Sequence, residues 1–286
     1  MRKRMNRTWA EIPKAEVERL ADGLTAKTYA ADWMTDDSGF AFAEAILGQR
    51  LELSFPNDAT LTLSFRSETE LAWDDSDGAQ GSGFYRALSA PGHPRVVFVH
   101  QYRDGLWPPT CVDLVLDLET GYATVVIAQL GGDERPREAV HTIRFGEITG
   151  IPHPADAEPH GYTTDLIGKA IHWEMPAFTG KPPIKHIYLS PLYYGIFMTR
   201  EDGTCYMAAD PADYIRIRGN LYLVSVIEAR RSGIQLNFLI NTDLLEDVVG
   251  HFGISAGNER GQDEPKIVCT VMTGRKGTFV PMETLW

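Results

Sequence analysis

From Gly48 onward the chain consists of short runs in which apolar and polar residues alternate, with turn residues between them. Alternation with a period of two places successive side chains on opposite faces of a strand, and turn signals spaced about every ten residues are typical of all-β proteins. In the first half the runs are RLELSF, TLTLSF, ELAW, FYRAL, RVVFVHQYRDG, CVDLVLDLETG and YATVVIAQL. This pattern predicts an antiparallel all-β region.

The segment IPHPADAEPHGYTTD, residues 151–165, has no such periodicity. Its proline, histidine and acidic residues predict a linker. A second series of strand-like runs follows: LIGKAIHWEM, IKHIYLS, YYGIFMTR, TCYMAA, DYIRIRG, NLYLVSVIE, IQLNFLIN and KIVCTVMTG.

The two series follow one plan. ILGQRLELSF matches LIGKAIHWEM, PRVVFVHQYRDG matches GNLYLVSVIEARRSG, and CVDLVLDLETGYATVV matches IQLNFLINTDLLEDVV. In each copy the hairpin ends on an aspartate, Asp117 or Asp243. Such a repeat predicts two related β modules, and closing each module into a barrel leaves no strand edge exposed.

A helical segment is predicted before the first barrel. Pro13 suits a first helical turn, and four apolar residues follow at helical spacing: Val17, Leu20, Ala21 and Leu24. The stretch AADWMTDDSGFAFAEAILG favours a second, shorter helix leading to Gly48. The predicted division is a helical segment (1–45), a first barrel (46–150), a linker (151–165) and a second barrel (166–286).

Composition narrows the class of protein. Hydrophobic residues make up 43% of the 286 residues and charged residues 23%, as in soluble globular proteins. The net charge of -12 repels phosphate groups, so nucleic acid and anionic membranes are not expected partners. The basic N-terminus is followed by no apolar signal region and no apolar stretch could span a bilayer, so a cytoplasmic location is expected.

No motif indicates a cofactor or a metal. The chain has no P-loop, no GxGxxG between a strand and a helix, no GxSxG and no HExxH. The three cysteines form no CxxC pair and are expected to be buried free thiols: Cys111, Cys205 and Cys269. Four metal-capable residues of the linker match no known ligand spacing: His153, Asp156, Glu158 and His160.

The second series carries a resemblance to a family. LIGK, HIYLS, LYLVSVIE and GHFG, together with the tandem arrangement over residues 48–280, resemble the molybdenum cofactor biosynthesis protein F (MoaF) family. The resemblance implies two calycin- or lipocalin-like barrels in one chain. It further implies a protein that binds a small aromatic or pterin-like molecule, linked to molybdenum cofactor biosynthesis. The family name comes from genetic context and defines no reaction.

A second likeness is local. LIGKAIHW followed by LYLVSVIEARRSGIQLNFLINTD is similar to the phenolic acid decarboxylases, small calycin barrels that decarboxylate p-hydroxycinnamic acids without a cofactor. Their later strand carries a Val-Ser-Trp-Thr-Glu pattern whose glutamate transfers protons, and Val224, Ser225 and Glu228 fit that pattern. The two tyrosines that hold the substrate carboxylate in that family correspond here to Trp173 and Met175. The likeness therefore supports the barrel more than the reaction.

Two residues of the second barrel are candidate catalytic groups. Glu228 ends an apolar strand, and a carboxylate inside an apolar cavity has a raised pKa and can act as a general acid or base. At the rim it would instead pair with Arg230 or Arg231 in solvent. His186 could contact a ligand or shuttle a proton, or it could be a buried structural residue.

The ligand-binding prediction depends on which strand faces point inward. A filled barrel would turn its aliphatic faces inward, whereas a ligand-holding barrel would turn its polar faces inward and pair them. In the second case the predicted ligand contacts are Tyr188, Tyr194, Tyr214, Arg216 and Tyr222. In the first barrel His100 and Tyr102 share a strand face and are further candidates, but no carboxylate there matches Glu228.

Three functions therefore remain open. The first is a binding protein for a small aromatic or pterin-like molecule. The second is a cofactor-independent lyase that decarboxylates a hydroxycinnamate-like acid with Glu228 as acid or base. The third is a structural protein with filled barrels whose surface binds a protein partner. Aromatic strands would also suit a homodimer.

Overall fold

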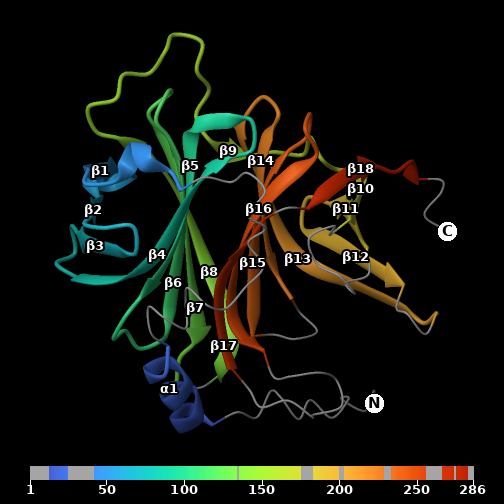
Figure 1. The fold of residues 1–286 in the computed structure, drawn as a ribbon, viewed down its shortest axis with the longest axis horizontal. Coiled ribbons are helices and arrows are strands. Elements are labelled where there is room, and N and C mark those ends of the chain that lie inside the picture. Colours follow the sequence, from blue (N-terminus) through green and yellow to red (C-terminus); the bar gives the residue numbers. More distant parts are fainter. Residues whose placement is uncertain are drawn as a thin grey trace.

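The computed structural model describes residues 13–24, 42–133, 135–174, 183–199, 203–228, 233–255, 266–273 and 275–282. The chain forms two closed antiparallel β-barrels that stand side by side, and helix α1 lies at one end of them (Figure 1). The predicted all-β fold of two tandem barrels with a short N-terminal helix is confirmed.

Eight strands form the first barrel in chain order, and β1 pairs with β8 to close the ring. The alternation in TLTLSF decides which side chains fill it, because Leu61, Leu63 and Phe65 are buried and the residues between them are not. The strands are β1 (Arg50–Ser54), β2 (Thr60–Phe65), β3 (Glu70–Asp75), β4 (Gln80–Ala90), β5 (His93–Arg103), β6 (Thr110–Asp117), β7 (Tyr122–Gly131) and β8 (Arg135–Ile148).

The second barrel is also a ring of eight strands. Strands β10 to β16 pair in chain order, and β18 pairs with both β16 and β10. Two strands lie outside this ring, since β17 pairs with β16 and β9 pairs with β13. The strands are β9 (Gly161–Tyr162), β10 (Ala170–Glu174), β11 (Ile184–Ser190), β12 (Tyr193–Thr199), β13 (Cys205–Arg218), β14 (Leu221–Ile227), β15 (Ile234–Asn241), β16 (Glu246–Ser255), β17 (Lys266–Met272) and β18 (Lys276–Phe279).

Helical structure is sparse in the described residues. It comprises α1 (Lys14–Asp22) and two short 3₁₀ helices, η1 (Glu44–Ile46) and η2 (Pro56–Asp58). Val17 of α1 packs in one cluster with Tyr102 of the first barrel and Ile267 of β17, so the helix contacts both barrels. Most of the stretch predicted as a second helix lies outside the described residues. Within the described part of the chain, every helix is too short to cross a bilayer.

Some strands differ from the prediction. TCYMAA and DYIRIRG form the single strand β13, and the sequence pattern did not reveal β8, β9, β16 or β18. Glycines interrupt the alternating pattern of β16, so the sequence did not reveal this strand. Gly253 is required because an added Cβ would lie 1.7 Å from the carbonyl oxygen of Gly233. Strand β9 lies within the predicted linker. The four segment boundaries stay a prediction.

The internal repeat occupies equivalent places in the two rings. Strands β5 and β6 correspond to β14 and β15, the fifth and sixth strands of each ring. The hairpins after them begin with equivalent caps, since Asp117 Oδ1 and Asn241 Oδ1 each accept hydrogen bonds from backbone N–H groups two and three residues on. The prediction that Asp243 matches Asp117 is therefore wrong by two residues, because the register places Asn241 there.

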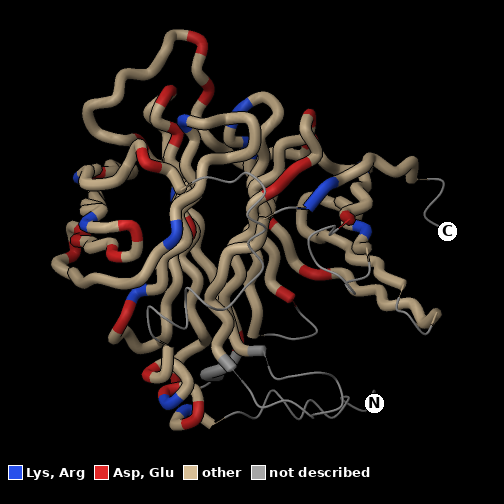
Figure 2. The backbone as a smooth tube through the Cα atoms, viewed as in Figure 1, with Lys and Arg blue, Asp and Glu red and all other residues tan. Residues whose placement is uncertain are grey.

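The barrels meet through the outer faces of these equivalent strands. A single buried cluster joins residues of both: Val96, Phe98 and Val115 of the first barrel with Leu221, Leu223 and Leu239 of the second. Figure 2 shows few charged residues along the central strands, and most of the red and blue segments lie on loops and outer strands. The contact is therefore an apolar core in its own right, and it buries faces that would point to water in a lone barrel.

Candidate functional site

The interior of the second barrel is aromatic and polar. Four of the predicted site residues lie in it with 2% exposure or less: His186, Tyr188, Tyr194 and Tyr214. The tyrosines share a cluster with Trp173 and Phe238, and the His186 ring lies 4.9 Å from that of Phe238. Of the two arrangements the sequence allowed, the described residues therefore adopt the one with the polar face inward.

A buried ion pair crosses this interior. Arg275 Nε donates to Asp247 Oδ1 at 3.0 Å and its Nη2 donates to Oδ2, a two-point contact between side chains that are both almost fully buried. The guanidinium lies 4.7 Å from the Trp173 ring and 5.1 Å from the Phe238 ring. Sequence reasoning missed both charges. Arg275 lies between β17 and β18, where no alternation assigns a direction.

His186 lies directly beside this ion pair. Its Nε2 is 3.4 Å from Arg275 Nη1, and burial, reinforced by that positive charge, lowers the pKa of His186 well below its usual value. The ring is therefore neutral, and because Nε2 faces a donor we assign its proton to Nδ1. Neither His186 Nδ1 nor Tyr188 Oη makes a well-formed hydrogen bond among the described residues, although both atoms are buried; the Trp173 side chain comes close enough to Tyr188 to oppose the rise in its pKa that burial causes.

Glu228 lies half-buried at the end of β14. Its backbone N–H donates to the carbonyl of Ile234 at 2.9 Å, and its Oε2 atom is shielded from solvent. Burial raises the pKa of Tyr194, Arg275 opposes that shift, and the negative charge of Glu228 adds to it. The carboxylate therefore acts electrostatically on the interior. Its predicted solvent partners, Arg230 and Arg231, lie outside the described residues, as does Met175.

Arg216 and Tyr222 lie at the rim of the barrel. Arg216 pairs with Glu158 of the linker and lies 3.8 Å from Asp165, while Tyr222 Oη donates to the Gly219 carbonyl at 3.0 Å. Arg216 and Tyr214 also line a surface groove of about 630 Å³ beside β9. These contacts place Arg216 outside the buried interior.

Tyr214 connects the groove to the interior. Its hydroxyl donates to the Tyr193 carbonyl at 2.8 Å, and its ring lies 5.9 Å from that of Tyr188 at an interplanar angle of 82°. Arg216 and Tyr214 therefore line the groove together, and Tyr214 contacts Tyr188 in the interior behind it.

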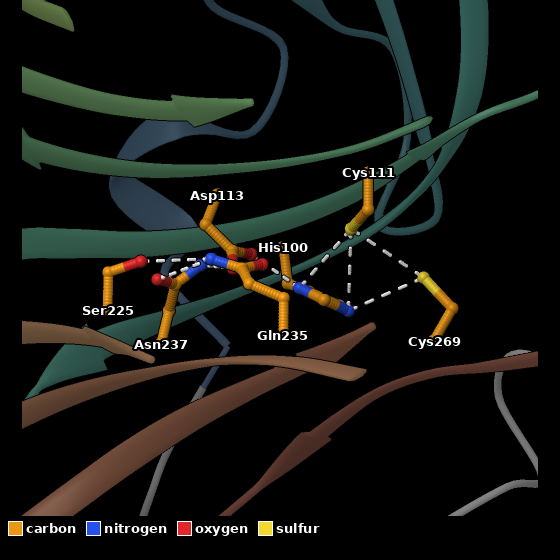
Figure 3. A network of polar contacts seen from close by, with 7 residues as sticks. All are labelled: His100, Cys111, Asp113, Ser225, Gln235, Asn237 and Cys269. Carbon is orange, nitrogen blue, oxygen red and sulfur yellow. Dashed lines mark hydrogen bonds and ion pairs between the residues drawn. The ribbon is translucent and has the colours of Figure 1, made fainter. Parts of the chain in front are cut away.

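His100 and Tyr102 point away from the interior of the first barrel. Both lie on the outer face of β5, where the two barrels meet. Figure 3 shows a polar network in this contact, in which His100 Nδ1 bonds Asp113 and Asn237 of the second barrel donates to the same carboxylate. Burial lowers the pKa of His100, but Asp113 and Cys111 outweigh it and raise the pKa to about 10.

The network continues along the second barrel. Gln235 donates to Asn237 at 2.9 Å and to Ser225 at 3.0 Å, and Ser225 Oγ is 3.2 Å from His141 Nδ1. His141 Nε2 is in turn 2.9 Å from Asp213. Ser225 is fully buried in the contact between the barrels, so it joins the two and does not line the interior.

The cysteines separate into two groups. Cys111 and Cys269 are buried and their sulfurs lie 3.7 Å apart, whereas Cys205 is exposed. The expectation of buried free thiols is thus wrong for Cys205, which lies at the exposed start of β13. Burial raises the pKa of both buried thiols.

The metal-capable residues of the linker do not converge. The His153 ring stacks on Tyr122 at 4.3 Å, and His160 Nδ1 bonds Thr124 Oγ1 at 2.9 Å. Glu158 forms an ion pair with Arg216. These contacts hold the linker against the barrels.

Comparison with known proteins identifies the first barrel. Residues 16–132 match the family model described as the MoaF N-terminal domain, and the predicted resemblance to the MoaF family is confirmed. The match reaches from α1 to the end of β7, whereas the motifs that suggested the resemblance lie mainly in the second barrel. No curated protein matches the chain.

Proposed function

We propose that the second barrel binds a small, flat molecule that carries hydrogen-bond acceptors, aromatic or pterin-like, in a role linked to molybdenum cofactor biosynthesis. The observation that carries the proposal is the pair of buried polar atoms without described partners, His186 Nδ1 and Tyr188 Oη. Buried polar groups in folded proteins nearly always have a partner, and an orphan buried group costs about 1–3 kcal/mol. A ligand that supplies acceptors removes this cost.

The surroundings select the kind of ligand. Trp173, Tyr194 and Phe238 make the interior aromatic, and a flat ring would pack against them by displacing Arg275 from the rings of Trp173 and Phe238. Asp247 already neutralises Arg275, so this pair contributes a dipole and no net charge of its own. A neutral or singly charged heteroaromatic ring with carbonyl oxygens fits such a site better than a phosphate does.

The groove beside β9 provides the approach. Tyr214 lines it and contacts Tyr188 behind it, and Arg216 stands at its edge. A rotation of Tyr214 would open the path, and Arg216 would attract an anionic substituent such as a carboxylate. These are the roles we assign to the two rim residues.

Thermal denaturation with a ligand panel tests the proposal. Xanthopterin, pterin-6-carboxylate and p-coumarate are suitable probes, because each is flat and bears acceptors. We expect one of these classes to raise the Tm, since a ligand at 100 times its Kd stabilises the native state by about 2.7 kcal/mol. Tyr188→Phe and His186→Asn should weaken binding at least several-fold.

Tyr85→Phe is the matched control. Tyr85 lies in the interior of the first barrel, where its hydroxyl donates to the Ser67 carbonyl. Loss of the Tyr85 hydroxyl should leave the ligand-induced rise in Tm unchanged. A flat response of the unmodified protein to the whole panel would contradict the proposal, as would a response that Tyr85→Phe lowers as much as Tyr188→Phe does.

A lyase acting on a hydroxycinnamate-like acid is the rival function. The solvent-shielded carboxylate of Glu228 and its effect on Tyr194 favour it. Turnover of p-coumarate that disappears in Glu228→Gln, while the variant still melts cooperatively, would establish that reaction. Binding without turnover across a panel of aromatic acids would contradict the lyase function and support the binding function.

A further inference from the structure

A cluster of three metal-ligating side chains lies in the contact between the barrels, apart from the site just described. His100 and Cys111 come from β5 and β6 of the first barrel, and Cys269 comes from β17 of the second (Figure 3). All three are buried, and one ligand atom from each lies within 4.8 Å of the others. We propose that this cluster binds a thiophilic metal ion of the Zn²⁺ class and thereby joins the two barrels.

The distances fit such an ion. Cys269 Sγ lies 3.4 Å from His100 Nε2 and 3.7 Å from Cys111 Sγ, and Cys111 Sγ lies 3.7 Å from the same nitrogen. A tetrahedral ion about 2.3 Å from each sulfur and about 2.0 Å from the nitrogen requires ligand atoms about 3.5–3.8 Å apart. The three atoms therefore have the spacing of one coordination shell, and because Cys111 Sγ also lies 3.6 Å from His100 Nδ1, the His100 ring must turn for Nε2 to point at an ion shared with that sulfur.

The neighbours of the cluster orient the histidine for this role. Asp113 bonds His100 Nδ1 and Asn237 donates to the other carboxylate oxygen. A carboxylate on one ring nitrogen directs the other toward a metal, an arrangement found around most metal-bound histidines. Gly250 of β16 permits it, because a Cβ there would lie 2.7 Å from Asp113 Oδ2 and 2.9 Å from His100 Nδ1.

The charge balance suits a buried position. A bound ion displaces one proton from His100 and one from each thiol, and the resulting two thiolates, neutral imidazole and divalent cation sum to zero, so no net charge remains within the coordination shell. Two thiolates and an imidazole are soft or borderline ligands, which excludes Mg²⁺ and Ca²⁺ in favour of Zn²⁺ or Cu⁺. The three protein ligands would complete a trigonal coordination shell around Cu⁺. Around Zn²⁺ they would leave the fourth position of a tetrahedral shell open.

The cluster also gives a role to β17, which lies against the first barrel. This strand lies outside the second ring and carries Cys269 opposite Phe252 of β16. A metal bound by Cys269, His100 and Cys111 would fix β17 to the first barrel. The sequence concealed the site because no two ligands lie close together along the chain.

Metal analysis tests the proposal. The full chain, expressed with added ZnSO₄ and purified under reducing conditions without chelator, should contain one zinc per chain by plasma mass spectrometry. Cys111→Ser and Cys269→Ser should each lose it, whereas Cys205→Ser, which alters the exposed third cysteine, should keep it. Asp113→Asn should bind zinc about 10–100-fold more weakly, as expected for a residue that orients a ligand.

Cobalt binding to the unmodified protein tests the site without any variant that could fail to fold. The unmodified protein refolded with CoCl₂ should show the visible absorption of tetrahedral Co²⁺ and a thiolate charge-transfer band. A wild-type protein that binds neither zinc nor cobalt overturns the proposal, as does a Cys269→Ser variant with the metal content of the wild type. A Cys111–Cys269 disulfide in protein kept under reductant would equally overturn it and assign the pair a covalent role.

Discussion

The two barrels share a strand order and differ in what fills them. The first interior is mainly leucine, valine, alanine and a few aromatic side chains, whereas the second holds four tyrosines, a histidine and a buried ion pair. Equivalent positions make the difference plain, because Val97 of β5 corresponds to Tyr222 of β14 and Arg103 corresponds to Glu228. An aliphatic interior stabilises by burial alone, but a polar interior must pair every group it buries.

The comparison of the two interiors concerns which barrel is the better candidate for a ligand site. The first interior pairs part of its polar groups with the chain itself, since Tyr85 bonds Ser67 and Gln101 Nε2 donates to the Leu71 carbonyl at 2.9 Å, but Trp73 Nε1 and Gln101 Oε1 are buried there without described partners. The second leaves His186 Nδ1 and Tyr188 Oη without described partners. The buried ion pair and His186 distinguish the second interior, and they are the basis of the binding proposal. Four experiments would break or sharpen this contrast.

The largest effect is expected from Arg275→Met. It leaves Asp247 buried without its partner, and breaking such a pair costs about 3–5 kcal/mol of unfolding free energy. Urea denaturation measures the loss. Lys276→Met is the matched control, because Lys276 pairs with Glu246 at an exposed position where ion pairs contribute about 0–1 kcal/mol. A loss in Arg275→Met no larger than in the control would show that the interior does not depend on the pair.

Leu114→Ala should destabilise the chain without affecting the ligand. Leu114 is fully buried in the first barrel at the position equivalent to Phe238, and truncating a buried leucine costs about 2–5 kcal/mol. The ligand-induced rise in Tm should persist once a ligand is known. Loss of that rise in a folded Leu114→Ala protein would show that the two barrels do not divide stability and binding between them.

The pH dependence of stability should report on His186. Its pKa lies below the unfolded value of about 6.5, so the unfolded chain binds the extra proton, and this contribution is present above that pH and lost as pH falls. The slope is at most about 1.4 kcal/mol per pH unit, where the unfolded His186 is protonated and the folded one is not. His186→Asn should flatten the curve by that amount in urea denaturation at several pH values. Parallel curves for the two proteins would mean that His186 is protonated in the folded state.

The smallest effects come from a matched pair of tyrosines. Tyr85→Phe removes a hydrogen bond to Ser67 and should cost about 1 kcal/mol. Tyr188→Phe removes a hydroxyl without a described partner and should cost about 0 kcal/mol or stabilise slightly. Both are measurable by urea denaturation of ligand-free protein. An equal cost would reveal a partner for Tyr188 within the chain and remove the main support for the binding proposal.

The sequence by itself determined most of the strands, the duplication and which residues share a strand face. Alternation placed His186 and Tyr188 on one face of β11, and both lie in the same interior. It also identified the MoaF relationship, which the match over residues 16–132 confirms. It missed β16, where Gly250 and Gly253 break the apolar pattern because neighbouring groups leave no room for a side chain.

Only the tertiary structure decided which face points inward. Alternation defines two faces of a strand but does not say which is the inner one, and the usual guide, apolar inside, fails here because the second barrel buries its aliphatic outer face against the first. The same contact brings Cys111 within 3.7 Å of Cys269, 158 positions away, and closure of the second ring sets Arg275 opposite Asp247. Such pairs depend on how the closed rings pack, which no local pattern records.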